Sequence, residues 1–367
     1  MKLIFDKSNL TKAVNIVLKA VPSKTTMSIL ECILIDATTN VIKFTSNDME
    51  LGIETCVQGD IIEKGKVSIE AKLFADIVRK LPDNKITIET DENYTSKITC
   101  EKSKFNIAGR SGDDFSYLPT IVKDKSITIS QFMLKEIINQ TIFSISPNDN
   151  NKMMTGELLE FKEGKLKLVG LDGHRIAIRN VTLEGEFDDV KVVVPGKTLS
   201  EISKILTADA ESMVHIYFTN NHILFEFDDT IIVSRLIDGE YFRINQMLSN
   251  DYETKITINK KEFIDSIDRA NLLISESDKR PIIINIINNS LEVKVNSVNG
   301  SLNEDIDIEK EGKDIMIGFN PKFLMDALKV IDDEMVDIYL VNPKAPCFIR
   351  DKNVNYIYLI LPVNFTA

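Results

Sequence analysis

The sequence has 367 residues, enough for two to four domains that each bury a core of their own. Hydrophobic residues make up 43% and charged residues 27%, which is typical of a soluble globular protein, and no apolar run approaches the length that a membrane span needs. The net charge of −12 argues against a protein that grips nucleic acid by bulk basic charge, although it leaves room for a local basic surface.

The N-terminus and the cysteines indicate the compartment. The first residues, Met-Lys-Leu-Ile-Phe-Asp, lack the long apolar core of a signal peptide. The cysteines are scattered, with no CxxC pair and no histidine at ligand spacing, at Cys32, Cys56, Cys100 and Cys347. Neither a disulfide framework nor a zinc site is indicated, and no metal or cofactor is expected. A cytoplasmic location is the simplest expectation.

The chain begins with two similar units of strand, helix and three strands. In the first, a strand at residues 3–5 precedes a helix whose apolar residues have helical spacing: Leu10, Ala13, Val14, Val17 and Leu18. Strands are then expected at residues 29–35, 41–46 and 52–57. The second unit has a strand at 66–69, a helix with Leu73, Ile77, Val78 and Leu81, and strands at 85–90, 96–100 and 104–108. Residues 118–125 have the composition of a linker.

Four more units of the same kind follow. The third has a helical stripe of Leu134, Ile137, Ile138, Thr141 and Ile142, then strands at 155–160, 166–171 and 174–178, the last two meeting at Asp172-Gly173. The fourth has a strand at 191–194, a helix with Leu199, Ile202 and Leu206, and strands at 213–218, 222–227 and 230–236.

The fifth unit has a strand at 255–258, a helix with Phe263, Ile267, Ala270 and Ile274, and strands at 282–287 and 291–295. The sixth has a strand at 314–317, a helix with Leu324, Ala327, Leu328 and Ile331, and strands at 336–340, 347–350 and 356–361. An internal repeat of this length fixes architecture before function is considered. We therefore expect an α+β protein of three similar domains, at residues 1–120, 127–245 and 251–367.

The predicted helices carry basic residues opposite their apolar stripes, at Lys12, Arg79, Lys80, Lys135, Lys204, Arg269 and Lys329. These residues fit a surface that attracts phosphate. They equally fit an ordinary solvated face, because acidic residues lie on the same helices, at Asp76, Glu136, Glu201, Asp265 and Asp326. The sequence pattern alone leaves both interpretations open.

Six short segments, in this order and on top of the sixfold repeat, carry a resemblance to a known family. They are Lys24-Thr-Thr26, Leu171-Asp-Gly-His-Arg-Ile-Ala177, Arg235-Leu-Ile-Asp-Gly239, Ile317-Gly-Phe-Asn320 with Leu324-Met-Asp-Ala-Leu328, and Tyr358-Leu-Ile-Leu-Pro362. Over its whole length the chain resembles the bacterial DNA polymerase III beta subunit, the sliding clamp.

The resemblance implies a DNA clamp fold that closes into a ring as a head-to-tail dimer, with helices lining the hole, and no catalytic activity. It implies that the ring encircles double-stranded DNA without regard to sequence. Its expected partners are the replicative polymerase alpha subunit, the clamp loader and other proteins that carry a clamp-binding motif.

The family's partner groove, between the second and third domains, can be carried over position by position. One wall would be Leu171, Gly173, His174, Arg175 and Ile176, with Met154 beside it. The other would be Leu359, Ile360, Leu361, Pro362 and Val363, with Phe242, Gln246 and Met247 contributing. An apolar cleft suits short hydrophobic-acidic peptides, and His174 and Arg175 would frame its edge with donors. Without the family, Asp172-Gly173 is as well explained as a strand turn and the tail as an edge strand.

Three positions depart from the family's pattern. Phe242 stands where a proline is usual, and Asn151 and Gln246 stand where arginines are common. The resemblance points to Lys24 and Asn148 in loops as DNA contacts, with Arg79, Lys80, Lys204 and Arg269 contributing diffusely. For the subunit contact it points to Phe105 and Ile107 on one side and Leu272 and Leu273 on the other, apolar residues that could equally be core.

Two other classes of protein deserve comparison. An enzyme using His174 as a base would need a partner acid or nucleophile and a pocket of converging polar groups, and no such motif accompanies it. A repeat scaffold that binds proteins without encircling DNA would share the groove, and would differ only in that no ring closes around DNA.

Overall fold

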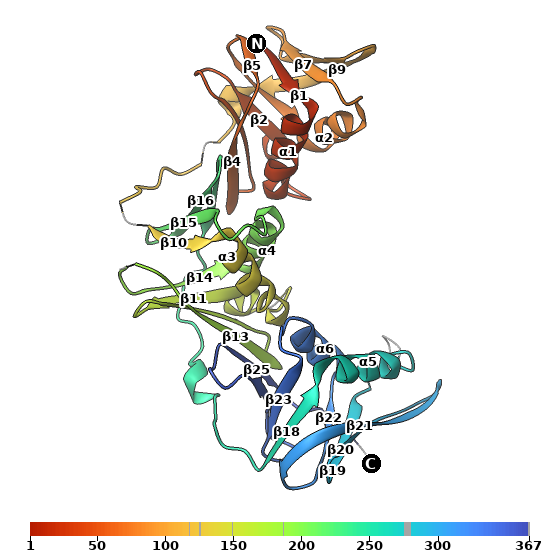
Figure 1. Cartoon of the computed structure of the whole chain (residues 1–367). Helices are drawn as coiled ribbons and strands as arrows, with labels where there is room; N and C mark the ends of the chain where they lie inside the picture. The colour runs from red at the N-terminus through yellow and green to blue at the C-terminus, as the bar shows by residue number, and fades with distance from the viewer. Residues whose placement is uncertain (117, 125, 149, 186, 275–279, 366–367) are drawn as a thin grey trace. The chain divides into compact units, whose positions relative to one another are not determined.

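The computed structural model describes residues 1–367 except 117, 125, 149, 186, 275–279 and 366–367 (Figure 1). Six α-helices occur among the described residues, and each directly follows a strand. They are α1 (Lys7–Val17), α2 (Ala71–Lys80), α3 (Gln131–Asn139), α4 (Gly196–Ile205), α5 (Lys260–Asn271) and α6 (Pro321–Lys329). Their order and spacing confirm the six repeated units.

The strands fall into three groups along the chain. The first is β1 (Lys2–Asp6), β2 (Cys32–Asp36), β3 (Ile42–Asn47), β4 (Leu51–Val57), β5 (Asp60–Glu63), β6 (Lys66–Glu70), β7 (Lys85–Thr90), β8 (Thr95–Cys100) and β9 (Ser103–Ser111). The second is β10 (Ile127–Ser130), β11 (Gly156–Lys162), β12 (Lys165–Leu171), β13 (Arg175–Thr182), β14 (Val190–Pro195), β15 (Met213–Phe218), β16 (His222–Phe227) and β17 (Thr230–Arg235). The third is β18 (Thr254–Asn259), β19 (Ile282–Ile287), β20 (Ser290–Ser297), β21 (Gly300–Gly312), β22 (Ile315–Phe319), β23 (Met335–Leu340), β24 (Cys347–Arg350) and β25 (Tyr356–Ile360).

One pairing rule recurs in all three groups. The first strand of each unit pairs antiparallel with the second strand of the other unit in its group. These pairs are β1 with β7, β6 with β2, β10 with β15, β14 with β11, β18 with β23, and β22 with β19. The two units of a domain therefore exchange their first strands, and neither completes a sheet alone.

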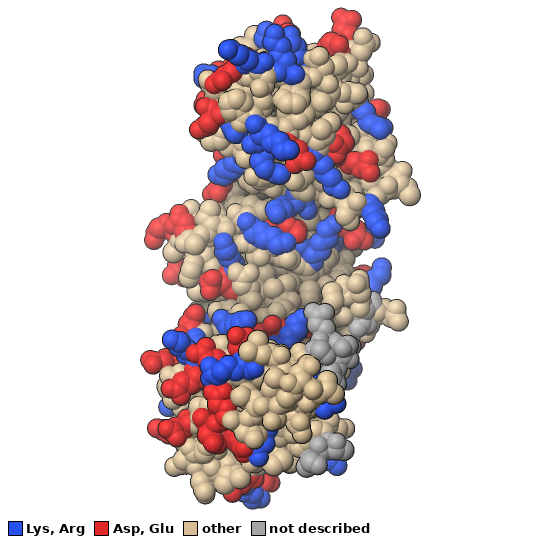
Figure 2. All heavy atoms as spheres, turned by 90° about the vertical axis from the view of Figure 1, so that its right-hand side faces the viewer, with Lys and Arg blue, Asp and Glu red and all other residues tan. Residues whose placement is uncertain are grey.

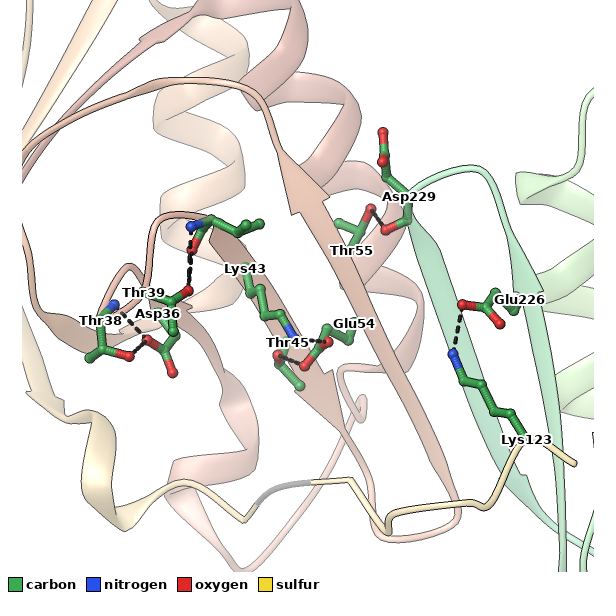
Figure 3. Close-up of polar contacts among 11 residues, drawn as sticks. Asp36, Thr38, Thr39, Lys43, Thr45, Glu54, Thr55, Lys123, Glu226 and Asp229 are labelled. Carbon is green, nitrogen blue, oxygen red and sulfur yellow. Dashed lines mark hydrogen bonds and ion pairs between the residues drawn. The ribbon is translucent and has the colours of Figure 1, made fainter.

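Further antiparallel pairs join the three groups into longer sheets. β4 pairs with β17, and Thr55 Oγ1 donates to the main-chain oxygen of Asp229 at 3.3 Å beside that pair (Figure 3). β13 pairs with β25. The result is one sheet of 13 strands and one of 12. They lie in two compact units, residues 1–133 with 204–236 and residues 134–203 with 237–367. The predicted boundaries of all three domains stay a prediction.

The helices pack their apolar stripes against the sheets, largely as their spacing predicts. In α1, for example, Leu10, Ala13, Val14 and Val17 are buried. Leu73 is the exception in α2, since 48% of it is exposed while Phe74, Ile77 and Val78 are buried. The charged N-cap Glu70 accepts hydrogen bonds from the backbone N–H groups of Lys72 and Leu73, which satisfies two donors at the start of α2.

Two strands were not expected from the sequence, and one begins later than expected. β5 has only four residues, with two isoleucines side by side, and in the 13-residue β21 the partly buried Glu304 and Lys310 interrupt the alternation of apolar and polar residues. The expected strand at 29–35 begins only at Cys32, because residues 28–31 form a 3₁₀ turn.

Candidate functional site

The turn between β12 and β13 is held by its own side chains. Asp172 Oδ1 accepts a hydrogen bond from the backbone N–H of His174 at 3.0 Å, and the Asp172 N–H donates to the Arg175 carbonyl at 3.3 Å. Gly173 has a φ of 82°, and a Cβ placed there would meet no atom within 4 Å. Glycine is therefore favoured at this position because the backbone is left-handed there, and not because a side chain would lack space.

Arg175 fastens this turn to its surroundings. Its side chain is only 7% exposed; Nε donates to Asp172 at 3.0 Å and Nη1 to Asp326 on α6 at 2.7 Å. Nη2 donates to the Phe143 carbonyl, and the guanidinium lies 4.4 Å from the ring centre of Phe323. The expectation that Arg175 offers donors at the groove edge is therefore not met, because its polar atoms bind groups within the fold and these pairs compensate its buried charge.

The chain after β25 runs beside the same turn. Arg175 lies opposite Ile360 and Ile176 opposite Leu359 in the antiparallel register. Beyond the strand, the Leu361 N–H donates to the His174 carbonyl at 2.8 Å, and the Val363 N–H donates to the Gly318 carbonyl at 2.8 Å. The residues carried over from the family as two walls are thus brought together by backbone hydrogen bonds.

An apolar cluster lies under these walls. Leu171, Ile176 and Leu359 are buried in it with Tyr241, while Met154 and Phe242 pack against it partly exposed. The rings of Tyr241 and Phe242 meet edge to face with centroids 5.4 Å apart. Around it, the exposed apolar residues are Met247 (48%) and Leu361 (37%), with Pro362 and Val363 half-buried. A partly exposed apolar surface over a rigid apolar base is what an anchoring side chain of a peptide requires.

Ile360 does not belong to this surface. It is 1% exposed and lies in the other core cluster, with the buried residues of α5 and α6, because alternate residues of β25 face opposite sides of the sheet. Asn151 has a structural role, because its side chain accepts a hydrogen bond from the Met153 N–H at 3.1 Å and caps the short turn that carries Met154. Gln246 is exposed.

Glu157 is an ionisable group that the sequence search missed. It lies on β11 and is 0% exposed. Within the described part of the chain, neither of its carboxyl oxygens has a hydrogen-bond partner. Burial raises the pKa of Glu157 to about 8, against a smaller opposing effect of the nearby Thr141 hydroxyl. Near neutral pH the group is therefore largely protonated.

The residues expected to contact DNA differ in their exposure and in the ion pairs that they form. Lys24 and Asn148 are exposed in loops, and Lys80 and Lys204 are exposed at helix ends. Arg79 forms an exposed ion pair with Asp76 at 2.9 Å. Arg269 is engaged more fully, because Nε donates to Glu304 at 2.9 Å and Nη2 donates to the other oxygen of the same carboxylate. This pair lowers the pKa of Glu304 and raises that of Arg269.

The residues expected at the subunit contact are divided between surface and core. Phe105 is 39% exposed and Leu272 82% exposed, whereas Ile107 is 9% exposed and Leu273 packs against the core of its own domain. Residues 103–108 of β9 pair with β8 alone, and residues 300–307 of β21 pair with β20 alone, among the strands that the structure describes. Two strand edges thus remain open next to exposed apolar side chains.

Three domains, each made of two strand–helix–strands units that exchange their first strands, define the DNA clamp fold. Comparisons with known proteins agree. Models of the DNA polymerase III beta subunit match residues 1–119 (N-terminal domain), 128–242 (central domain) and 245–364 (C-terminal domain). The chain belongs to the bacterial DNA polymerase III beta subunit family.

Individual relatives are similar over almost their whole length. The beta sliding clamp of Bacillus subtilis is 34% identical over 99% of both chains, and that of Staphylococcus epidermidis is 32% identical over 99% of both. A crystal structure of a putative DNA polymerase III beta subunit from Eubacterium rectale is 63% identical over both full chains, with a TM-score of 0.96. The Bacillus subtilis clamp structure, 33% identical, also has a TM-score of 0.96 over both full chains. None of the described helices combines the length and apolar character needed to cross a bilayer.

Proposed function

We propose that this protein is a sliding clamp, a ring-shaped processivity factor that encircles double-stranded DNA and tethers the replicative polymerase. The family membership and the sixfold repeat support this function over a scaffold that does not encircle DNA. The observation that carries it is the pairing between the last strands of the units, which leaves two of these strands with an open edge.

The last strands of the six units are β4, β9, β13, β17, β21 and β25. Within one chain β4 pairs with β17 and β13 with β25, which leaves β9 and β21. Both retain an open edge over residues 103–108 and 300–307. An open edge is a template for another strand, so β9 of one copy and β21 of a second would form the third junction. Because each copy supplies one edge of each kind, two copies satisfy both edges in a closed head-to-tail dimer.

In this dimer, Phe105 and Ile107 on β9 and Leu272 and Leu273 after α5 would line the subunit contact. Lys24 and Asn148 would contact the encircled duplex, together with Arg79, Lys80 and Lys204. The contact is independent of sequence because phosphate, not the base edges, is the group recognised.

The partner groove would lie over the apolar cluster of Leu171, Ile176 and Leu359. Met154, Phe242, Met247, Leu361, Pro362 and Val363 would contact the peptide, while Gly173 shapes the turn, Arg175 holds it from behind, and His174 and Gln246 lie at the rim. Ile360 supports the wall from the opposite face of the sheet. We propose that the polymerase alpha subunit, the clamp loader and other motif-carrying proteins share this groove in the cytoplasm, and that the protein itself catalyses no reaction.

The decisive experiment compares retention on circular and linear DNA. The protein, loaded onto nicked circular DNA by a clamp loader, is expected to persist through moderate salt, because topology and not adhesion holds it. Cutting the circle should release it promptly. A protein held by six to ten phosphate contacts would instead lose roughly 10³- to 10⁵-fold in affinity between about 50 and 200 mM salt on either form of DNA. Equal dissociation from circular and linear DNA would support the scaffold alternative.

A further inference from the structure

The helix pairs α1–α2 and α5–α6 are equivalent by the internal repeat, and side-chain contacts fix their alignment. Lys7, at the start of α1, donates through Nζ to the carbonyl of Leu81 at the end of α2. Lys260, at the start of α5, donates in the same way to the carbonyl of Ile331 after α6. This shared contact aligns Lys7 with Lys260 and Leu81 with Ile331 as equivalent positions.

The buried residues support this alignment. Leu10, Ala13, Val14 and Val17 of α1 correspond to Phe263, Ser266, Ile267 and Ala270 of α5, and all eight are buried. Glu70 and Asn320, which cap α2 and α6, also correspond, and each accepts a hydrogen bond from the backbone N–H two residues later. The exposed residues of the two pairs can therefore be compared one by one.

The exposed positions of α1 and α5 differ in charge. Lys12 of α1 corresponds to Asp265 of α5, and Asn15 corresponds to Asp268. Arg269, on the same helix, is engaged by both carboxylate oxygens of Glu304. Lys12 forms no hydrogen bond or ion pair in the part of the chain that the structure describes.

The whole helix pairs differ in the same direction. The helices α1 and α2 carry four exposed Lys or Arg residues and one exposed carboxylate, Asp76. The helices α5 and α6 also carry four exposed Lys or Arg residues, but three exposed carboxylates, Glu262, Asp265 and Asp268. Figure 2 shows Lys and Arg side chains over much of one face of the protein, with Asp and Glu side chains close to many of them. Only the first pair has a clear positive excess.

We infer that, of these two helix pairs, the α1–α2 face attracts the encircled duplex more strongly, through Lys12, Lys72 and Lys80, and that the α5–α6 face contributes little attraction. This inference rests on the proposed function. It adds Lys12 and Lys72 to the DNA-contacting residues and removes Arg269. Phosphates attract cations whose charge is not already neutralised, and an arginine bound to a carboxylate must give up that pair before it can bind a phosphate.

The test measures binding of a short fluorescent DNA duplex to the full-length protein by anisotropy across a salt series. One variant carries Lys12→Ala, Lys72→Ala and Lys80→Ala. Its matched control carries Lys261→Ala, Lys322→Ala and Lys329→Ala, which remove the same number of exposed lysines from α5 and α6. The first variant should bind more weakly, and its log–log salt slope should fall by about 0.9 for each phosphate that it no longer neutralises. The control should retain affinity and slope close to those of the unaltered protein.

A charge reversal tests the inference from the other side. Asp265→Lys places a lysine where the equivalent helix has Lys12, so it should raise affinity and steepen the slope by about 0.9. Equal reductions in affinity in the two triple variants, or no gain from Asp265→Lys, would overturn the uneven distribution while leaving the proposed function intact. Failure of the unaltered protein to bind the duplex even at low salt would overturn the proposed function and this inference with it.

Discussion

At the scale of single residues, Glu157 couples stability to pH. Its folded pKa of about 8 exceeds the ordinary value of 4.5, so between these values the folded protein holds a proton that the unfolded chain releases. The free energy of unfolding should therefore fall as pH rises through this window, by about 1.4 kcal/mol per pH unit. Glu157→Gln cannot ionise and so does not show this decline. In thermal unfolding at pH 6 and pH 8, the melting temperature of the variant relative to that of the unaltered protein should be higher at pH 8 than at pH 6.

A matched control lies on the same strand. Glu160 is half-buried beside Lys167, with 4.0 Å between the charged atoms, and Glu160→Gln should shift the melting temperature equally at both pH values. The same shift at both pH values for Glu157→Gln would mean that the buried carboxyl is already ionised in the folded protein. Such a result would require a partner for its charge.

At the scale of elements, the proposed groove depends on side chains that project from the apolar cluster of Leu171, Ile176 and Leu359. Met247 is 48% exposed beside the apolar cluster, and Met335, at the start of β23, is 47% exposed elsewhere in the same compact unit. Met247→Ala should weaken binding of a hydrophobic clamp-binding peptide by roughly 1–2 kcal/mol, about 5- to 30-fold, because the variant removes an exposed apolar side chain from the proposed groove. Met335→Ala should leave the affinity, measured by fluorescence anisotropy, unchanged. A groove elsewhere would make the two variants indistinguishable.

The same elements show what the sequence could predict. The helices and most strands were predicted because their apolar spacing reflects burial, as in α1 and β12. β21 was missed because the partly buried Glu304 and Lys310 stand at inward positions and interrupt the alternation of apolar and polar residues. The site residues were named through the family resemblance, but the structural role of Arg175 was not, because its partners Asp326 and Phe143 lie far away in the chain. Long-range polar contacts of this kind leave no periodic signal.

At the scale of the whole molecule, the open edges of β9 and β21 make a second copy of the chain the natural partner. Leu272 is 82% exposed beside one of these regions, so an aspartate there costs the isolated chain little. In the dimer that charge would be buried in an apolar contact without a partner, which is strongly unfavourable. Leu272→Asp should therefore give a folded monomer in analytical ultracentrifugation, with the circular dichroism of the unaltered protein.

The position of the substitution decides how clearly this result can be interpreted. Leu273 packs against the core of its own domain, so an aspartate there would disturb folding as well as association. Val122, in the segment before β10, is 68% exposed and offers the control, since Val122→Asp adds the same charge at a residue outside β9, β21 and the segment after α5. Val122→Asp should remain a dimer. If Leu272→Asp also remains a dimer at micromolar concentration, the contact between copies lies outside β9 and β21, and the third strand junction must be closed in another way.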